Sequence, residues 1–565
     1  MGSGNQLTWH VPTTSTVQQE LQQAIRRTDW RFLLPVSGEE AFENLVLLGG
    51  PPGVAEQVVA MGIARRVHTA VLSGRCADAV VRLHDSRVDL LSAATCLRPG
   101  GVIYGEFDRR LPAFRYETPA RVTNRLRGAG ISPGGVYWVR DSFRDHRVYL
   151  PAESSRAIRW YFSRLHRSPS YSLRGHIVTA VYRLAAVFGA RPLSHLMRCF
   201  AVTGTFGPVR THAASILTAS DLPAAFAGGT LRAIVLAPRL RRVAFLPFAP
   251  GERRPRGVLK VSRLPIRNSK TAAEHVALTT VGGYLDGYLR TSIPCSLGTY
   301  NWRGLLVGAE SYVHGRLFAR RRHVSTRRAM RSYVADLHAM TDWLIAFHRQ
   351  TRLDGQAWGS AEVQRFTQSL DDYQQAFGLT DDERQLFGLA TARARTLEGT
   401  PLPIVWCHGD LNANNAYRTS RGVTVVDWEE GGQGLPMLDL LYFLEHWLYL
   451  APNAPRSRRE KVDRFHHVFV QADSADPASA EIHGALRRYM TELRIHRPFY
   501  PVLHTLLWVR LAVWRFRHAD EVNQDDIARS FEARYVGCVR ALAAGASQLF
   551  DDPCSRTNYV TSDHG

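Results

Sequence analysis

The fold of this chain is decided by residues 404–415, which read Ile404-Val405-Trp406-Cys407-His408-Gly409-Asp410-Leu411-Asn412-Ala413-Asn414-Asn415. The apolar run at the start predicts a short buried strand, which ends in a turn that contains Asp410 and, five residues later, Asn415. A second β-branched run, residues 423–426, delivers another carboxylate, Asp427, at its end. Two strand ends therefore present two carboxylates and one amide.

This set of groups suits one chemistry. Phosphoryl transfer from a nucleotide needs a carboxylate that orients and deprotonates the attacking hydroxyl, and it needs oxygen ligands for Mg²⁺. Each group alone is unremarkable, since a strand-end Asp often only caps the next helix. Their order, with each group after a β-like run, is much harder to obtain by chance.

The spacing His-x-Asp-x-x-x-x-Asn, followed by a strand-end Asp, resembles the catalytic loop and the metal-binding Asp of kinase-fold enzymes. The variant found here is similar to the aminoglycoside phosphotransferase family of small-molecule kinases, on the His-Gly-Asp-Leu sequence, Asp-Trp-Glu at 427–429, Gly434, Pro436 and Asp439. The resemblance implies that Asp410 is the catalytic base and that Asn415 and Asp427 are the Mg²⁺ ligands.

The sequence departs from the family in the turn between these residues. The family usually has a His-Pro-Gly type turn, whereas residues 412–414 here are Asn-Ala-Asn. Asn tolerates the left-handed backbone conformation that a Gly would supply, so the turn is expected to form.

Upstream, the run Gly257 to Val261 predicts a short strand that carries Lys260 near its end, and Glu274 follows in a helix-compatible run. The resemblance implies that this Lys and Glu pair cradles the nucleotide phosphates. The chain has 71 Lys plus Arg, of which only Lys260, Lys270 and Lys461 are Lys, so a Lys stands where a compact point charge is needed. Lys270, in the adjoining loop, is the competing candidate.

Residues 305–312 read as a strand that runs into a hinge. They resemble the linker of the family, which implies that Glu310 and Tyr312 lie where the backbone binds the adenine edge. An amphipathic helix is predicted over residues 333–348, and its Leu-x-x-x-His ending is similar to the helix that follows the hinge in these enzymes.

No glycine-rich phosphate loop is recognisable. The two expected first strands, residues 231–236 and 243–248, are separated by a Pro-Arg-Leu-Arg-Arg segment. Either arginines contact the phosphates in place of glycine N–H groups, or the phosphate loop is poorly formed.

The N-terminal third predicts an alternating α/β sheet. Residues 43–53 read as a buried strand that enters a glycine-rich turn, and a helix over 55–64 and a strand over 67–72 follow. Residues 88–91 and 97–105 read as two further strands. The Leu-x-Pro-Gly-Gly turn at the start of the last one resembles class I S-adenosylmethionine-dependent methyltransferases.

Two features of this part disagree with methyltransferase chemistry. The second strand ends without the carboxylate that holds the ribose hydroxyls in the family, and Pro51 and Pro52 stiffen the loop that approaches the cofactor. We therefore expect a degenerate domain that does not bind S-adenosylmethionine. A working methyltransferase is the alternative.

Composition bounds the remaining classes. The 565 residues allow two or three domains, and 45% hydrophobic and 10% aromatic residues are typical of globular chains. The seven cysteines show no Cys-x-x-Cys spacing, which predicts neither a zinc site nor a disulfide framework and favours a reducing, cytoplasmic location. The N-terminus shows no signal peptide pattern.

The chain is strongly basic, with a formal charge of +21. Its arginines are spread along the whole sequence without an RNA-binding motif, so no specific nucleic-acid partner is expected. Peripheral contact with an anionic membrane stays open, and residues 177–190 and 503–516 are too short and too Arg-interrupted to span a bilayer.

We therefore predict an α/β Rossmann-like N-terminal domain and an α+β, two-lobed, protein-kinase-like domain with a helical C-terminal region. The expected divisions are a methyltransferase-like domain at 1–165, a helical connector at 166–225, a kinase-like domain at 226–550 and a disordered tail at 551–565. The expected function is ATP- and Mg²⁺-dependent phosphorylation of a hydroxyl on a sugar, aminocyclitol or related metabolite. The alternatives are a non-catalytic pseudokinase and pseudo-methyltransferase scaffold, or a bifunctional methyltransferase-kinase. The sequence does not indicate an oligomeric state.

Overall fold

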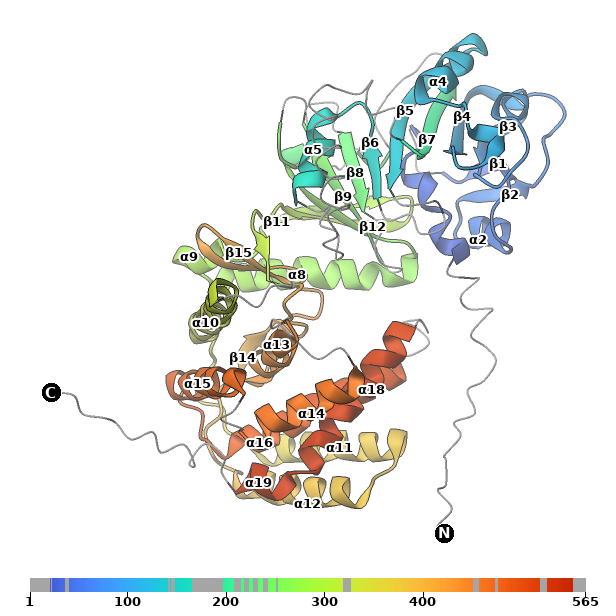
Figure 1. Cartoon of the computed structure of the whole chain (residues 1–565). Coiled ribbons are helices and arrows are strands. Elements are labelled where there is room, and N and C mark those ends of the chain that lie inside the picture. Colours follow the sequence, from blue (N-terminus) through green and yellow to red (C-terminus); the bar gives the residue numbers. More distant parts are fainter. Residues whose placement is uncertain are drawn as a thin grey trace. The chain divides into compact units, whose positions relative to one another are not determined.

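The computed structural model (Figure 1) describes residues 21, 23–35, 40–140, 143, 148–164, 197–207, 215–217, 223–226, 232–236, 242–249, 252–318, 327–450, 457–472, 476–518 and 526–551. The chain divides into two compact units. Unit 1 comprises Met1–His275 and Ser296–Tyr312, and unit 2 comprises Val276–Cys295 and Val313–Gly565.

A twelve-stranded sheet forms the frame of the described part of unit 1, in the order β11-β12-β10-β9-β8-β6-β5-β7-β4-β3-β1-β2. Its strands are β1 (Phe42–Leu48), β2 (Ala64–His68), β3 (Ala77–Arg82), β4 (Leu97–Asp108), β5 (Ile131–Arg140), β6 (Val148–Pro151), β7 (Cys199–Phe206), β8 (Arg232–Leu236), β9 (Arg242–Phe248), β10 (Gly257–Ser262), β11 (Ser296–Trp302) and β12 (Leu305–Ser311). The helical elements are η1 (Asp29–Phe32), α2 (Val54–Ala60), α3 (Leu90–Ala94), η2 (Pro112–Phe114), α4 (Pro119–Gly128), α5 (Ser155–Arg164), η3 (Ser215–Leu217), η4 (Ala224–Phe226) and η5 (Pro265–Arg267), and α8 (Asn268–Tyr284) begins in this unit.

Strands β2, β1, β3 and β4 run parallel to one another, as an alternating α/β pattern requires. Every residue of β3 is buried, which is typical of a strand covered on both faces. The predicted strands near 43–48 and 97–105 are confirmed, and the Gly-Gly turn lies in a bulge of β4, where a Cβ on Gly101 would lie 2.9 Å from the Arg98 carbonyl oxygen.

Two predicted strands differ from the structure: the one predicted over 67–72 forms over Ala64–His68, and the one over 88–91 is wrong. Residues 88–91 enter the short helix α3, because the Asp89 side chain accepts hydrogen bonds from the N–H groups of Leu91 and Ser92 and so caps the first turn. The third parallel strand is β3 instead, which the sequence reading did not identify.

The predicted division of the N-terminal half also differs from the structure. Within the expected helical connector, residues 199–206 form β7, which is antiparallel to both β4 and β5 and lies between them. Six of its eight residues are buried, so the strand is part of the core. The boundaries at 165 and 225 therefore fall inside unit 1, while the helices expected over 166–196 lie outside the described residues.

Unit 2 is mostly helical and surrounds the largest apolar core. Its helices are the end of α8, α9 (Gly287–Arg290), α10 (Arg327–Gln350), α11 (Ser360–Phe377), α12 (Asp381–Thr396), α13 (Leu438–Leu448), α14 (Arg458–Phe469), α15 (Pro477–Glu492), α16 (Phe499–Arg517), α18 (Asp526–Ala543) and α19 (Ala546–Phe550). This unit also contains two small sheets. The first consists of β13 (Arg316–Leu317), β15 (Ala416–Thr419) and β16 (Gly422–Val425), and the second consists of β14 (Val405–Cys407) and β17 (Gly432–Gly434).

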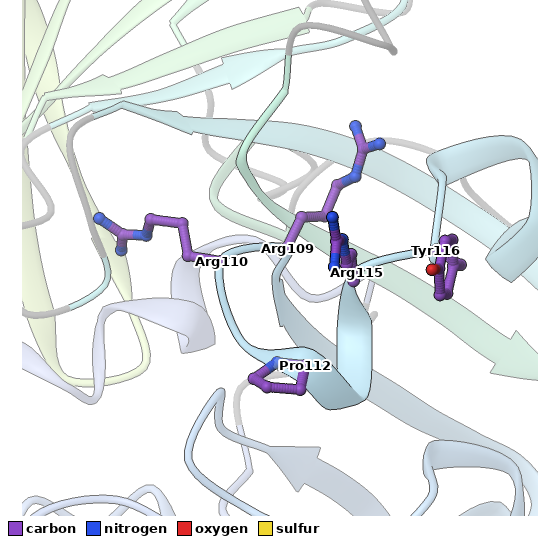
Figure 2. Close-up of a pocket in the computed structure, with 5 residues that line it drawn as sticks. All are labelled: Arg109, Arg110, Pro112, Arg115 and Tyr116. Atoms are coloured by element: carbon purple, nitrogen blue, oxygen red, sulfur yellow. The ribbon is translucent and has the colours of Figure 1, made fainter.

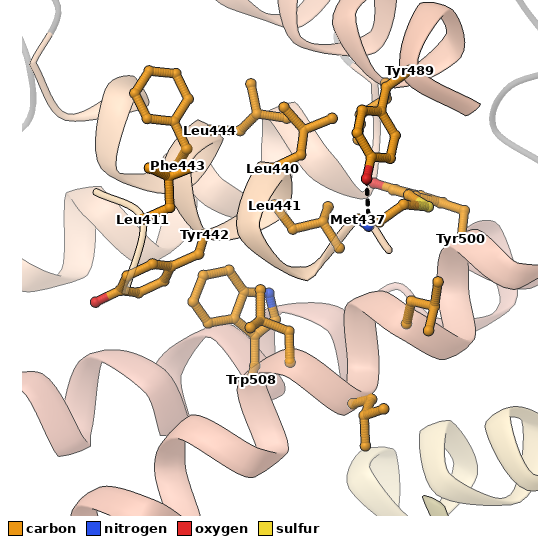
Figure 3. Packing of buried hydrophobic residues seen from close by; sticks show 14 of the residues in the cluster. Leu411, Met437, Leu440, Leu441, Tyr442, Phe443, Leu444, Tyr489, Tyr500 and Trp508 are labelled. Atoms are coloured by element: carbon orange, nitrogen blue, oxygen red, sulfur yellow. Dashed lines mark hydrogen bonds between the residues drawn. The ribbon is translucent and has the colours of Figure 1, made fainter. Parts of the chain in front are cut away.

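The predicted helical C-terminal region is confirmed. Helix α13 is apolar almost all round, and its leucines pack in the core with Trp508 of α16 (Figure 3). Among the residues that the structure describes, no helix combines the length and the apolarity that crossing a lipid bilayer requires. The tail predicted from 551 lies, beyond its first residue, outside the described part.

Candidate active site

The loop after β14 is shaped by a glycine that no other residue could replace without strain. Gly409 has φ +81°, and a Cβ at this position would lie 2.5 Å from the carbonyl oxygen of Glu430. Both facts exclude a side chain, because the left-handed conformation and the close approach of another backbone favour glycine. The chain can therefore reverse sharply between His408 and Asp410.

Asp439, in the first turn of α13, holds this loop through hydrogen bonds to its backbone. One carboxylate oxygen accepts the N–H of His408 at 2.6 Å and the other accepts the N–H of Gly409 at 3.0 Å. Burial raises the pKa of the Asp439 carboxyl, while the electrostatic interaction with His408 and these two backbone donors lower it. A carboxylate that accepts two backbone N–H groups fixes the path of the loop.

The His408 ring links the loop to the second carboxylate-bearing segment. Its Nε2 lies 3.0 Å from the carbonyl oxygen of Val426, and its Nδ1 lies 3.2 Å from the backbone nitrogen of Asp410. A carbonyl oxygen can only accept, so Nε2 carries the proton and Nδ1 accepts the N–H of Asp410. One ring thus sets the spacing between Asp410 and the residue that precedes Asp427.

Two amides hold Asp410 itself. Asn412 Nδ2 donates to the Asp410 carbonyl oxygen at 3.1 Å and to Oδ1 at 3.2 Å. Asn415 Nδ2 donates to the same carbonyl oxygen at 2.9 Å and to Oδ2 at 3.2 Å. Each carboxylate oxygen therefore has one amide donor, which restricts the rotation of the side chain.

The pKa of Asp410 is raised above its ordinary value. Burial is the main cause, and the negative charge of Asp427 adds to it, while His408 and hydrogen bonds from Tyr442 and Asn412 oppose the rise. A carboxyl whose pKa moves toward the working pH is a better proton acceptor. A carboxyl whose pKa is raised by burial and by a neighbouring carboxylate is typical of catalytic sites.

Asp427 adopts an unusual backbone conformation for a residue with a side chain, with φ +72°. It follows Val426, whose N–H donates to the carbonyl oxygen of Asn415 at 2.9 Å, so the two predicted metal ligands lie in adjoining segments. The amide nitrogen of Asn415 is used by Asp410, which leaves its oxygen as the ligand atom. One amide oxygen and one carboxylate suit Mg²⁺, which needs few protein ligands.

The histidine that ends the Leu-x-x-x-His sequence of helix α10 is buried and contacts residues that hold the loop. His348 Nδ1 lies 2.5 Å from the Tyr489 hydroxyl, and its Nε2 lies 3.9 Å from Asp439. Burial lowers the pKa of His348 to about 3, so the ring is neutral. The Tyr489 hydroxyl accepts the N–H of Met437 at 3.1 Å (Figure 3), which ties the start of α13 to this support.

A second cluster lies in unit 1 around Lys260 of β10. Its Nζ lies 2.6 Å from Oε1 of Glu274 on α8 and 3.0 Å from Oε1 of Glu310 on β12. The other oxygen of Glu274 accepts from Arg242 Nη1 at 2.8 Å. Of the two candidate lysines, Lys260 forms the predicted pair with Glu274.

The predicted hinge residues lie at the end of β12. Glu310 is paired within the sheet with Val258 of β10 and Ser296 of β11, and its side chain binds Lys260. Tyr312 packs edge-on against Trp160 of α5, with ring centroids 5.6 Å apart. The proposed contacts of this segment with adenine stay a prediction.

The sequence reading missed three residues of these clusters. Asn412 was expected only to shape a turn, although an amide two residues after the base can reach back to it. Tyr442 is one helical turn after Asp439, and its hydroxyl also lies 3.0 Å from that of Tyr535. Arg242 ends the Arg-rich segment whose residues 237–241 lie outside the described part.

Comparison with known families bears on this geometry. Residues 294–484 match the model of a phosphotransferase enzyme family. The C-terminal region therefore contains a phosphotransferase-family domain. The matched region includes Asp410, Asn415 and Asp427, and it begins after Lys260 and Glu274. A search of curated proteins found no match.

Solved structures with similarity to this chain include a choline/ethanolamine kinase family protein from Mesorhizobium loti, with 14% identity, a TM-score of 0.35, and coverage of 60% of this chain and 98% of that one. A macrolide 2'-phosphotransferase from Brachybacterium faecium has 16% identity, a TM-score of 0.35, and coverage of 55% and 92%. An aminoglycoside phosphotransferase from Streptomyces rimosus, in complex with ADP and streptomycin, has 13% identity, a TM-score of 0.28, and coverage of 53% and 90%. Identities and TM-scores this low do not support a conclusion about function, so the family match is the comparison that bears on the site.

A surface pocket of about 340 Å³ shares no lining residue with either cluster. Figure 2 shows its lining, which consists of Arg109, Arg110, Pro112, Arg115 and Tyr116. The Arg110 guanidinium is bound by Asp108, at 2.6 Å, so part of the positive charge is already neutralised. None of the predicted site residues lines this pocket.

Proposed function

We propose that the protein is an ATP-dependent phosphotransferase that transfers the γ-phosphoryl group to a hydroxyl of a small molecule. A sugar, an aminocyclitol or a related metabolite is the acceptor class that the family resemblance suggests. The observation that carries the proposal is the support of Asp410: two amides and a histidine hold a carboxylate of raised pKa beside a second carboxylate, inside the region that matches the phosphotransferase family.

In this proposal Asp410 accepts the proton of the acceptor hydroxyl and aligns its oxygen for attack. Asn415 and Asp427 hold Mg²⁺, which would neutralise charge on the nucleotide phosphates. Lys260, oriented by Glu274, supplies a point charge for the nucleotide phosphates. The segment of Glu310 and Tyr312 binds the adenine edge.

Nucleotide binding that depends on Mg²⁺ is the first test. A thermal shift titration of the full chain with ATP should raise the melting temperature when Mg²⁺ is present and by much less when it is chelated. Screening a panel of hydroxyl-bearing metabolites for ATP consumption then identifies the acceptor. A pseudokinase scaffold would bind partners or ligands without any panel member increasing ATP turnover above the background.

For the N-terminal part of unit 1 we propose a degenerate, methyltransferase-like domain that does not bind S-adenosylmethionine. The parallel strands β2-β1-β3-β4 support the Rossmann-like assignment. The N–H of Gly50, in the turn that would approach a cofactor, is already bound by the Asp85 carboxylate at 2.9 Å. After β2, no carboxylate precedes Asp78, which binds Arg98 and the N–H of Asn44.

The same proposal places the protein in the cytoplasm without a nucleic-acid partner. No disulfide joins the cysteines in the described part of the chain, which suits a reducing compartment. Many arginines on the described surface form ion pairs with carboxylates, such as Arg125 with Asp89 and Glu117. These pairs reduce the charge that is available to an anionic membrane or nucleic acid.

A further inference from the structure

A short buried segment near the N-terminus packs against both halves of the unit 1 sheet. Every residue of η1, Asp29 to Phe32, is buried. The Phe32 ring contacts Phe245 of β9 and Trp302 of β11, at centroid distances of 5.6 and 5.1 Å. The Trp30 ring lies 6.3 Å from Tyr104 of β4, in the parallel half. The segment is therefore part of the core beneath the strand that carries Lys260.

Asp29 forms an ion pair in this core with Arg263, three residues after Lys260. Nε of Arg263 donates to Oδ1 at 2.7 Å and Nη2 donates to Oδ2 at 2.6 Å. The side chains of Asp29 and Arg263 are 0% and 1% exposed, so the pair is shielded from solvent. Arg31 adds a hydrogen bond from Nη2 to the Arg263 carbonyl oxygen at 2.7 Å, which holds the main chain at the end of β10.

The same guanidinium reaches the phosphate cluster. Arg263 Nη1 donates to the carbonyl oxygen of Arg242 at 3.1 Å. The Arg242 side chain in turn binds Glu274 at 2.8 Å, and Glu274 binds Lys260 at 2.6 Å. Polar contacts thus link Asp29 to the ammonium group of Lys260, with Arg242 accepting through its backbone carbonyl and donating through its side chain, and all five residues belong to unit 1.

We propose that Asp29 is a positioning residue for the nucleotide-phosphate site, acting through Arg263 and Arg242 on Glu274 and Lys260. The inference rests on the proposed function, because it assumes that Lys260 binds phosphate. Removing the Asp29 carboxylate leaves the buried charge of Arg263 without its bidentate partner, a situation that proteins avoid by moving or hydrating the cation. The Arg242 carbonyl oxygen and the carboxylate of Glu274 are the next groups along the path, so Lys260 loses its fixed position.

The test is nucleotide affinity, measured by calorimetry on the full chain with Mg-ADP, which needs no knowledge of the acceptor. Asp29→Asn keeps the volume of the side chain and removes its charge, and it should weaken binding roughly tenfold, within the range typical of coupled sites. Asp29→Glu restores the carboxylate and should recover part of the affinity. All measurements are made well below the unfolding temperature of the least stable variant.

Glu106→Gln is the matched control. Glu106 is buried and forms an ion pair at 2.5 Å with Arg27, which belongs to the same N-terminal segment but lies on the side of β4. This variant should lower the melting temperature as Asp29→Asn does and leave the affinity for Mg-ADP unchanged. An equal loss of affinity in both variants would mean that packing of the segment, and not the Asp29 pair, sets the site, and would overturn the proposal.

Lys260→Ala separates the inference from the proposed function. If Lys260→Ala abolishes binding while Asp29→Asn binds like the natural chain, Lys260 binds phosphate and Asp29 does not position it. If Lys260→Ala binds nucleotide normally, the proposed phosphate site is wrong, and the inference falls with it. If Asp29→Asn does not fold, Arg263→Lys replaces it in the test. This variant keeps the buried positive charge but loses the bidentate hydrogen bonds to Asp29, so its affinity for Mg-ADP should lie between those of the natural chain and Lys260→Ala.

Discussion

At the scale of single residues, Asp410 is the group whose chemistry is most sharply defined. Asp410→Asn keeps the size of the side chain and removes the proton acceptor. Because positioned proton transfer contributes on the order of 10²–10⁴-fold, turnover should fall by that factor while Mg-ADP affinity changes little. Steady-state rates with an identified acceptor, together with calorimetry, measure both quantities. Unchanged turnover would exclude Asp410 as the base.

Tyr442 is expected to set the pH at which Asp410 works. The base is active when it is deprotonated, so activity is present above the pKa of Asp410 and is lost as the pH falls through it. The Tyr442 hydrogen bond lowers that pKa, so Tyr442→Phe should move the acidic limb of kcat/KM to higher pH.

The control for this shift is Tyr373→Phe. Tyr373 is also buried and donates to a carboxylate, Glu383, at 3.0 Å, but it lies among α11 and α12. This variant should leave the pH profile in place. A limb that does not move in Tyr442→Phe would show that its hydroxyl does not act on Asp410.

A substitution at Asp427 tests the proposed Mg²⁺ site separately from the proposed catalytic base. Asp427→Gly removes the carboxylate and suits φ +72°, so it avoids the backbone strain that an Ala would add. The dependence of ADP affinity on Mg²⁺ should disappear. Arg494→Gly, at an exposed position with φ +54°, makes the same kind of backbone change without a ligand and should leave that dependence intact. Metal dependence that persists in Asp427→Gly would leave Asp427 a structural role only.

At the scale of elements, the turn between β14 and Asp410 depends on Gly409. Gly409→Ala meets both a left-handed φ and a contact of 2.5 Å, so it should cost about 1–3 kcal/mol of stability and displace Asp410. Gly432→Ala on β17, where a Cβ has open space and φ is not positive, should be nearly neutral. Chemical unfolding and turnover of the two variants measure the difference. Equal effects would contradict the geometry of the turn.

The parts of the site that depend only on neighbouring residues can be predicted from the sequence. Strand ends that present Asp410 and Asp427, and a Lys on a strand before a helix with a Glu, are visible because each group follows its own short apolar run. Helix α3 was missed because the capping side chain of Asp89 outweighs a short β-like run. Asn412 was missed because a polar turn residue does not reveal which atom its amide binds.

Long-range contacts lie beyond such reasoning. Strand β7 is a central strand because it pairs with both β4 and β5. A run of eight residues does not show which distant strands it will pair with. The pairing of Asp29 with Arg263 cannot be predicted from the sequence either, because each residue alone is typical of a solvated surface.

At the scale of the molecule, the continuous sheet predicts that the N-terminal part cannot be isolated at residue 165. Such a fragment lacks β7 and the apolar strands against which Phe32 packs. It should show no cooperative unfolding transition, whereas the full chain should. Calorimetry on the full chain should find no binding of S-adenosylmethionine at micromolar concentrations.

A cooperative transition in the 1–165 fragment would show that β7 is dispensable to the core. Micromolar binding of S-adenosylmethionine by the full chain would contradict a degenerate domain and favour the bifunctional alternative. The two results are independent, because a fragment that folds need not bind a cofactor.

The ion pair between Asp29 and Arg263 joins residues 234 positions apart, which has a consequence for biosynthesis. Ribosomes elongate at about 5–20 residues per second, so Asp29 leaves the ribosome roughly 10–50 s before its partner is made. During most of that interval Phe32 has neither Phe245 nor Trp302 to pack against, and the nascent segment exposes aromatic surface. We therefore expect the newborn chain to depend on chaperones until the strand that carries Lys260 has emerged.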